Sequence, residues 1–176
     1  MPARAFAPVA LDLQALANLA TALALLVAVV FGALQFRHAQ RRRKDALMQE
    51  AIHLAQSESV INAIELALAI PDPVLQTFDA QPKESQQAAW SSLYIMEAMG
   101  FMVWERMLGL HDLDLFMGGA TRGLWKKFKP LVEATRVAQA NPGKLEWLQW
   151  LAERMVEDPA PGKNLGAHVA FRDWKR

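Results

Sequence analysis

The hydrophobic positions of this chain begin with one uninterrupted run, from residue 16 to residue 36. The run, LANLATALALLVAVVFGALQF, contains no charged residue, and only Asn18, Thr21 and Gln35 are clearly polar. A helix of this length is roughly 31 Å long, about the thickness of the hydrocarbon core of a bilayer. The pattern predicts a transmembrane helix over 16–36, preceded by a short extracytoplasmic N-terminus over 1–15.

Basic residues follow this run at once, whereas only Arg4 precedes it. Lys and Arg beside a span stay on the cytoplasmic side, which predicts a bacterial inner-membrane protein with its N-terminus outside and its C-terminal part in the cytoplasm. The basic juxtamembrane segment, 37–46, is expected to contact membrane lipid through five side chains. These are Arg37, Arg41, Arg42, Arg43 and Lys44.

Two other interpretations of the apolar run stay open at this level. A cleaved signal peptide carries its positive charges before the run and a small-residue cleavage site after it. A buried helix of a soluble protein would show a polar face to water, and this run has none. The order of the charges and the absence of a polar face both favour a span.

Beyond the span the apolar residues keep helical spacing, and no alternating strand pattern occurs. The first helix is expected to continue from the span through Ile70, because proline at residue 71 cannot extend it. Its leucines and isoleucine recur every seven residues and are expected to pack on the other helices, or alternatively to form a dimer seam. This heptad stripe consists of Leu47, Leu54, Ile61 and Leu68.

The later helices are expected over 82–108, over 112–140 with a kink or restart at Pro130, and over 144–157. The predicted fold is therefore all-α, with one N-terminal transmembrane helix followed by a small cytoplasmic helical bundle. The bundle is expected to occupy 47–158, and a flexible basic tail is expected over 159–176.

Composition and charge narrow the function classes. The chain has 176 residues and no cysteine, so disulfides and thiolate metal sites are excluded. Residues 45–158 carry nine Lys/Arg and sixteen Asp/Glu, a net charge of −7, whereas 37–44 carry +5 and 159–176 carry +3. An acidic body makes nucleic acid an unlikely main partner, and basic ends suit an anionic lipid surface.

The stretch from residue 94 to residue 155 resembles a bacterial family known as domain of unknown function 4760. The resemblance rests on an aromatic residue and Glu before Gly, Trp ahead of Lys-Pro, then Arg, and a late helix with an aromatic residue and Leu. These positions are Tyr94, Glu97, Gly100, Trp125, Lys129, Pro130, Arg136, Trp147 and Leu151. The resemblance implies one N-terminal span and a small helical domain, and it implies no activity.

Glu97 is the polar residue that most needs an explanation, because it falls on an apolar stripe where a free carboxylate is costly. The structural interpretation is a buried charge pair with Arg136, or in second place with Arg122. The functional interpretation is a general acid or base of a membrane-tethered enzyme, with Arg136 or His111 as its partner.

No other motif predicts catalysis, a cofactor or a metal. Glu50 and His53 have the spacing of one half of a di-metal bundle site, but the matching residues of the other half are missing. His111 and Asp112 are expected in a loop and a helix cap, and Gly118 in close helix packing. The tryptophans at 90, 104, 125, 147 and 150 are expected in the core and in helix contacts.

Small residues recur every fourth position along the span and would let two helices approach closely in lipid. They are Ala20, Ala24, Ala28 and Gly32. The chain is therefore interpreted as a single-pass membrane protein whose helical domain is an interaction or scaffold module, bound to a second copy or to another membrane protein. A membrane-tethered enzyme and a sensor of lipid charge are the alternatives.

Overall fold

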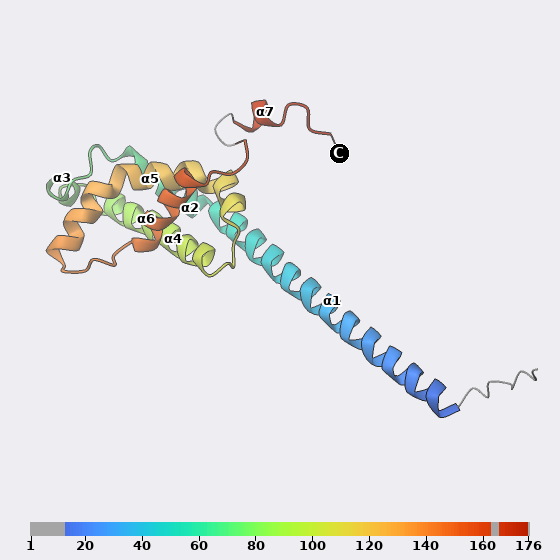
Figure 1. Ribbon diagram of the computed structural model, residues 1–176. Coiled ribbons are helices and arrows are strands. Elements are labelled where there is room, and N and C mark those ends of the chain that lie inside the picture. Colours follow the sequence, from blue (N-terminus) through green and yellow to red (C-terminus); the bar gives the residue numbers. More distant parts are fainter. Residues whose placement is uncertain (1–12, 163–165, 176) are drawn as a thin grey trace, which may run out of the picture. The chain divides into compact units, whose positions relative to one another are not determined.

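The computed structural model describes residues 13–162 and 166–175 (Figure 1). Most of the expected N-terminal segment over 1–15, including Arg4, therefore lies outside the described residues, as do 163–165 and 176 of the expected tail. The chain divides into two units, residues 1–43 and residues 44–176.

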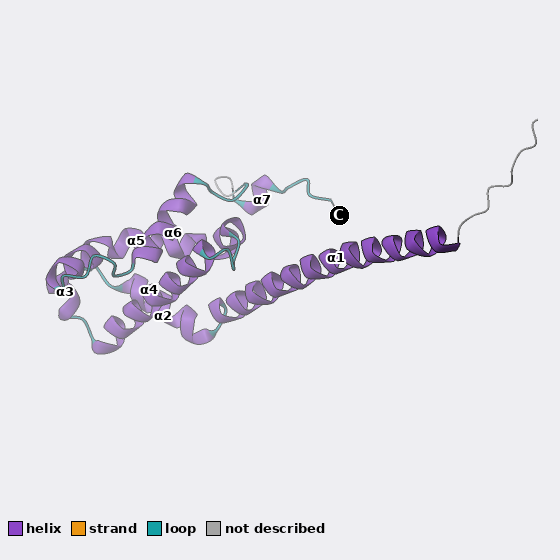
Figure 2. Cartoon of the chain, turned by 60° about the horizontal axis from the view of Figure 1, so that its bottom comes forward, coloured by secondary structure: helices purple, strands orange, loops and turns teal. Residues whose placement is uncertain are grey.

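Every regular element in the described part is a helix, so the prediction of an all-α fold is confirmed (Figure 2). One long apolar N-terminal helix is followed by a helical bundle. The helices are α1 (Leu13–Ala55), α2 (Glu58–Ala69), α3 (Leu75–Asp79), α4 (Lys83–Trp104), α5 (Leu110–Ala138), α6 (Glu146–Glu157) and α7 (Ala167–Ala170).

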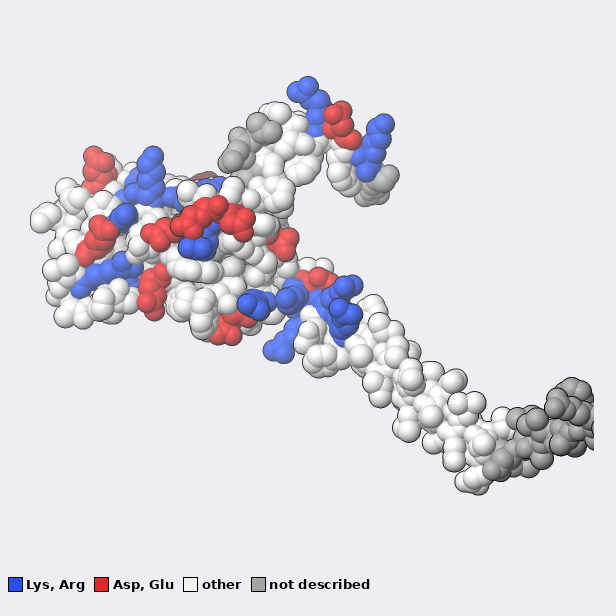
Figure 3. All heavy atoms as spheres, in the orientation of Figure 1, with Lys and Arg blue, Asp and Glu red and all other residues white. Residues whose placement is uncertain are grey.

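Helix α1 contains the apolar run, and it is long and apolar enough to span a membrane, a test that a signal sequence near the N-terminus would also pass. Its side chains from residue 14 to residue 36 are exposed. The hydroxyl of Thr21 donates to the carbonyl of Ala17 at 2.8 Å, which satisfies the one hydroxyl of the run inside the helix. Figure 3 shows this uncharged stretch in white and the Lys and Arg side chains that follow it in blue.

The expected continuous helix through Ile70 is wrong, because the chain breaks at Gln56 and Ser57. Ser57 takes an extended backbone conformation at the start of α2, and its hydroxyl donates to the carbonyl of Leu54 at 2.7 Å. The break changes the phase of the heptad stripe, and Leu54, Ile61 and Leu68 are exposed. Smaller residues make the buried contacts instead: Ala51, Ala55, Val60 and Ala67.

The bundle consists of α2, α4, α5 and α6, with α4 in contact with both α2 and α6, and α5 in contact with α6. Phe128, Leu93 and Leu124 are fully buried at its centre. Lys127 of α5 donates to the carbonyl of Leu68 near the end of α2, where helix carbonyls lack partners. Helix α5 begins at Leu110 and continues through Pro130, so the expected restart at that proline is not observed.

Candidate functional site

Glu97 lies on α4, and its carboxylate caps the start of α6. The backbone N–H of Leu148 donates to Glu97 Oε2 at 2.6 Å. Helix α6 has no side-chain cap of its own, because its N-cap residue is Leu145, which takes a left-handed conformation with φ of 56°. A carboxylate is favourable there, since the first N–H groups of a helix are unpaired and carry partial positive charge.

The pKa of Glu97 is raised above its ordinary value because burial disfavours the charged form. The N–H groups of Leu148 and Trp147 act in the opposite direction, because hydrogen bonds to the carboxylate stabilise its charge. Nearby Glu146 adds to the rise, and the positive charge of Arg136 opposes it more weakly than the two N–H groups do. Desolvation therefore outweighs the capping interaction in setting the proton affinity of Glu97.

The expected ion pair between Glu97 and Arg136 is not among the ion pairs of the described residues, and the hydrogen bonds of each side chain go to other partners. Arg136 donates from Nε to the carbonyl of Lys144 at 2.8 Å and from Nη1 to Gln149 Oε1 at 2.7 Å. A third bond runs from Nη2 to the carbonyl of Leu145 at 3.2 Å. Glu97 and Arg136 therefore bind the same segment, the turn at the start of α6, where Leu145 has a left-handed backbone. Glu97 accepts hydrogen bonds from N–H groups of this segment, and Arg136 donates hydrogen bonds to its carbonyl groups.

A buried ion pair does occur, and it joins Asp114 to Arg122. Both residues are on α5, Asp114 is fully buried, and Arg122 Nη1 lies 2.5 Å from Asp114 Oδ1. The second oxygen of Asp114 accepts the backbone N–H of Ala160 at 2.9 Å. Gly118 lies between the two on the same helix face, and a Cβ there would be 1.8 Å from Asp114 Oδ1. Gly118 is therefore closely packed, as expected, but its neighbours are the side chains of the Asp114–Arg122 ion pair and not another helix.

Of the two partners in the enzyme alternative, Arg136 contacts the same turn as Glu97, whereas His111 pairs with a residue outside that turn. His111 Nε2 lies 3.2 Å from Asp158 Oδ1 at an exposed position, whereas Glu97 is bound to the start of α6. His53 is an exposed residue in the last turn of α1. Over residues 13–162 and 166–175, no group of three or more His, Cys, Asp or Glu side chains is arranged to hold a metal ion.

The tail and the turn before α6 each show a feature that the sequence pattern did not indicate. The tail contains the short helix α7, and its beginning belongs to the bundle, because Ala160 is buried and bonded to Asp114. In the turn, Lys144 Nζ lies over the ring of Trp90, 4.4 Å from its centroid, and donates to Gln139 Oε1 at 3.1 Å. Burial lowers the pKa of Lys144, since the charged ammonium loses water.

The residues assigned to the membrane are all exposed on α1. Ala20, Ala24 and Ala28 have no covering neighbour, and a Cβ at Gly32 would meet no atom within 4 Å. Arg37, Arg41, Arg42, Arg43 and Lys44 are likewise exposed. Association through the small-residue face and lipid contact through the basic segment both stay predictions.

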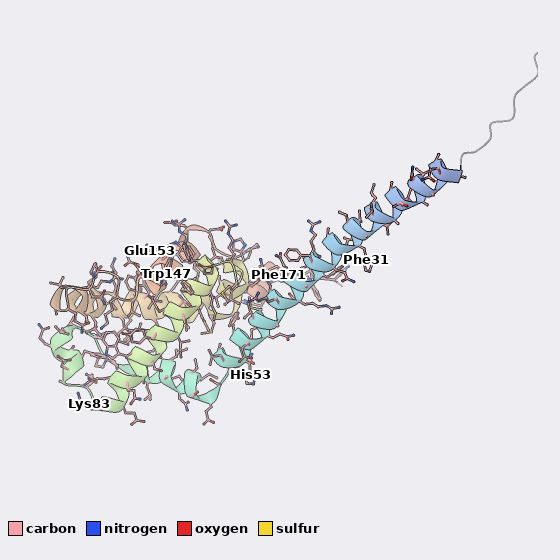
Figure 4. All side chains as sticks on the ribbon, turned by 90° about the horizontal axis from the view of Figure 1, so that it is seen from below. Phe31, His53, Lys83, Trp147, Glu153 and Phe171 are labelled. Carbon is pink, nitrogen blue, oxygen red and sulfur yellow. The ribbon has the colours of Figure 1, made fainter. Side chains whose placement is uncertain are left out.

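A partly exposed aromatic surface is the main feature that the sequence pattern missed. It consists of Phe101 and Trp104 on α4 and Trp147 and Trp150 on α6. The rings of Trp104 and Trp147 have centroids 4.9 Å apart, and Phe101 lies 5.9 Å from Trp147 and 6.1 Å from Trp104. Trp150 extends the cluster, 6.2 Å from Trp147. Figure 4 labels Trp147 beside the α4 ribbon.

Helix geometry explains why these four rings meet. In each helix the two aromatic residues are three positions apart, which places them on one face. Gly100 lets the helices approach, because a Cβ there would be 2.3 Å from the carbonyl oxygen of Trp147. Phe101 and Trp104 remain 43% and 50% exposed, so Trp104 makes the expected helix contact with Trp147 but is not a core residue.

A groove of about 890 Å³ adjoins the aromatic surface within the unit of residues 44–176. Trp104 and Trp150 line part of this groove, and apolar residues such as Met48, Met107 and Leu110 line much of the rest, together with four charged residues. These charged residues are Lys44, Asp45, Arg106 and Asp112. Exposed aromatic rings beside a charged rim are the usual composition of a protein–protein interface.

Comparison with known proteins identifies no relative: no family model, no curated protein and no solved structure matches the chain. The resemblance to the domain of unknown function 4760 family therefore stays a prediction.

Proposed function

We propose that this protein is a single-pass bacterial inner-membrane protein whose cytoplasmic domain, residues 44–176, binds another protein through the aromatic surface. The partner is a second copy of this chain or another membrane protein. The proposal includes membership of the domain of unknown function 4760 family, on the residues quoted above. It has no catalytic step and needs no cofactor.

One observation carries this proposal: four aromatic side chains from two helices form one cluster, in which Phe101 and Trp104 are exposed and Trp147 and Trp150 are half-buried. Burying large exposed rings on a partner releases water from apolar surface, which is favourable by about 25 cal/mol per Å². Rings that already hold each other in place lose little conformational freedom on binding. Trp is also among the residues that most often dominate interface energetics.

The membrane part of the proposal rests on α1 and on the charges that follow it. The apolar run is long enough to span a bilayer, and five basic residues follow it against one before it. This asymmetry favours a cytoplasmic domain. The exposed face of Ala20, Ala24, Ala28 and Gly32 suits association of spans, which would bring two domains together in parallel.

The enzyme alternative has less support. Glu97, its central residue, accepts a backbone hydrogen bond and is partly buried, and His111 is paired with Asp158. These contacts explain both residues without a substrate.

Site-specific photo-crosslinking in living cells tests the proposed interface. Photoreactive benzoylphenylalanine in place of Trp104 keeps an aromatic ring on the aromatic surface. The matched control carries the same group in place of Val137, which is 83% exposed on α5 and outside the aromatic surface. We expect a discrete crosslinked protein from position 104 and none from position 137.

The crosslinked product should also weaken when Trp147→Ala is added, because Trp147 packs directly on Trp104. Equal products from positions 104 and 137, or no product from position 104, would contradict the proposed interface.

A further inference from the structure

The C-terminal segment, residues 166–175, exposes three large apolar side chains to solvent. Val169 is 41% exposed, Phe171 is 45% exposed and Trp174 is 67% exposed. Phe171 is labelled in Figure 4. Three large apolar side chains within six residues form a patch that favours leaving water.

This segment is attached to the bundle at a defined point. Ala160 is 2% exposed and its N–H is bonded to the buried carboxylate of Asp114. Gly162 then takes φ of 76°, and a Cβ there would lie 2.6 Å from Ala170 Cβ and 3.3 Å from the ring of Phe171. The backbone at Gly162 therefore packs against the end of α7, close to the exposed rings.

Two basic side chains and one acidic side chain, Asp173, lie among the apolar side chains. Arg172 and Lys175 are exposed, and neither makes an ion pair with another residue of the described ranges. Figure 3 shows Lys and Arg side chains, in blue, on this segment. The whole stretch 159–176 has a net charge of +3, opposite in sign to the acidic body.

We propose that residues 169–175 form a second membrane contact, in which Phe171 and Trp174 enter the headgroup region of an anionic bilayer while Arg172 and Lys175 pair with lipid phosphates. This proposal rests on the proposed anchoring of the chain in a membrane. Tryptophan favours the membrane–water interface, where its ring is apolar and its N–H stays hydrated. Basic side chains add attraction to anionic lipid.

Because the proposed span keeps the domain close to the bilayer, a contact as short as residues 169–175 is sufficient to bind the membrane surface. Residues 36 and 44 are at most about 28 Å apart, even in a fully extended chain. A domain of this size has a radius of gyration of roughly 14 Å, so its surface lies within about 40 Å of residue 44. The segment can therefore meet the bilayer that holds the span, and an intramolecular contact needs little affinity of its own.

The absence of cysteine from the sequence allows a direct test on the full chain. Val169→Cys places one environment-sensitive fluorophore on the segment, and Val137→Cys places the same fluorophore on α5 as the matched control. Each protein is inserted through its span into nanodiscs of phosphatidylcholine alone or of phosphatidylcholine mixed with phosphatidylglycerol. Quenching by a nitroxide attached to the lipid headgroup region is then measured.

We expect quenching at position 169 to be at least about twofold stronger in the anionic discs, and to fall at high salt. Adding Phe171→Ser and Trp174→Ser, or Arg172→Ala and Lys175→Ala, should return it to the level in neutral discs. These side chains are exposed, so their replacement leaves the bundle intact.

Equal quenching in the two kinds of disc, quenching that survives both pairs of substitutions, or equal quenching at position 137 would overturn this membrane contact. The first two results would favour a protein partner for the segment. None of these results depends on the crosslinks from position 104, so failure of this contact is distinguishable from failure of the aromatic interface.

Discussion

The backbone N–H of Leu148 on α6 donates a hydrogen bond of 2.6 Å to the carboxylate of Glu97 on α4. One helix thereby supplies the cap that the other lacks, since Leu145 at the N-cap has an apolar side chain. The same two helices carry the four rings of the aromatic surface. The cap therefore fixes the register in which Trp104 and Trp147 meet.

Replacing Glu97 should show that an acceptor is needed at this position and that a charge is not. Glu97→Ala removes the cap and should lower the free energy of unfolding by about 1–2 kcal/mol. Glu97→Gln keeps an acceptor oxygen and should cost less than about half as much. Unfolding of the full chain in detergent is followed by tryptophan fluorescence, because all six tryptophans lie in residues 44–176. Equal costs for the two variants would show that the charge itself stabilises the contact.

The pH dependence of unfolding should carry the signature of Glu97. Its pKa in the folded domain is raised above the ordinary value of 4.5, so the folded state binds this proton more tightly than the unfolded state. The resulting stabilisation is fully present below pH 4.5 and is lost as the pH rises through the raised pKa. Relative to Glu97→Gln, the free energy of unfolding of the natural protein should therefore fall over this interval. A rise of this free energy difference over the same pH interval would contradict a raised pKa of Glu97.

Breaking the buried pair should be far more costly than breaking a surface pair. Asp114→Ala and Arg122→Ala should each lower the free energy of unfolding by about 3–5 kcal/mol, because each removes the opposite charge from the ion pair. The double variant should cost clearly less than the two single variants together. Arg154→Ala is the control: it breaks an exposed pair with Glu157 at 2.7 Å and should cost less than about 1 kcal/mol. Additive costs at Asp114 and Arg122 would contradict the pairing.

Two glycines should respond to alanine in opposite directions. At Gly100 the new Cβ would meet the carbonyl of Trp147, so Gly100→Ala should force α4 and α6 apart and cost about 1–3 kcal/mol. At Gly119, within α5, a Cβ meets no atom within 4 Å. Gly119→Ala should therefore stabilise the helix by about 0.5–1 kcal/mol. Thermal unfolding of both variants compares them, and stabilisation by Gly100→Ala would show that the helices do not approach there.

The sequence predicted the helices well where local signals decide them. The uncharged run identified α1, proline at residue 71 limited α2, and Asn141 and Gly143 marked the turn before α6. The break at Ser57 was missed, because nothing in the apolar pattern distinguishes it from a continuous helix. Once the chain breaks there, a seven-residue spacing across the break no longer defines one face, and Leu54 and Ile61 face solvent.

The polar contacts were predicted less well, because they depend on which helix ends meet. Glu97 does have a partner, but that partner is the start of α6 and not the side chain of Arg136. The left-handed backbone at Leu145, which leaves α6 without its own cap, is not indicated by an apolar residue. Gly100, one turn after Glu97, was the available signal of a close approach. The buried pair of Asp114 and Arg122 could have been found from their spacing of eight residues around Gly118.

The most direct test of the account is the location of the domain in the cell. A single cysteine at Val137→Cys, exposed on α5, is treated with a membrane-impermeant maleimide in bacterial spheroplasts that express the full chain. We expect the protein to stay in the membrane fraction after an alkaline carbonate wash. We also expect position 137 to react only after the inner membrane is broken. Reaction in intact spheroplasts, or release of the protein by carbonate, would contradict a membrane-anchored domain that faces the cytoplasm.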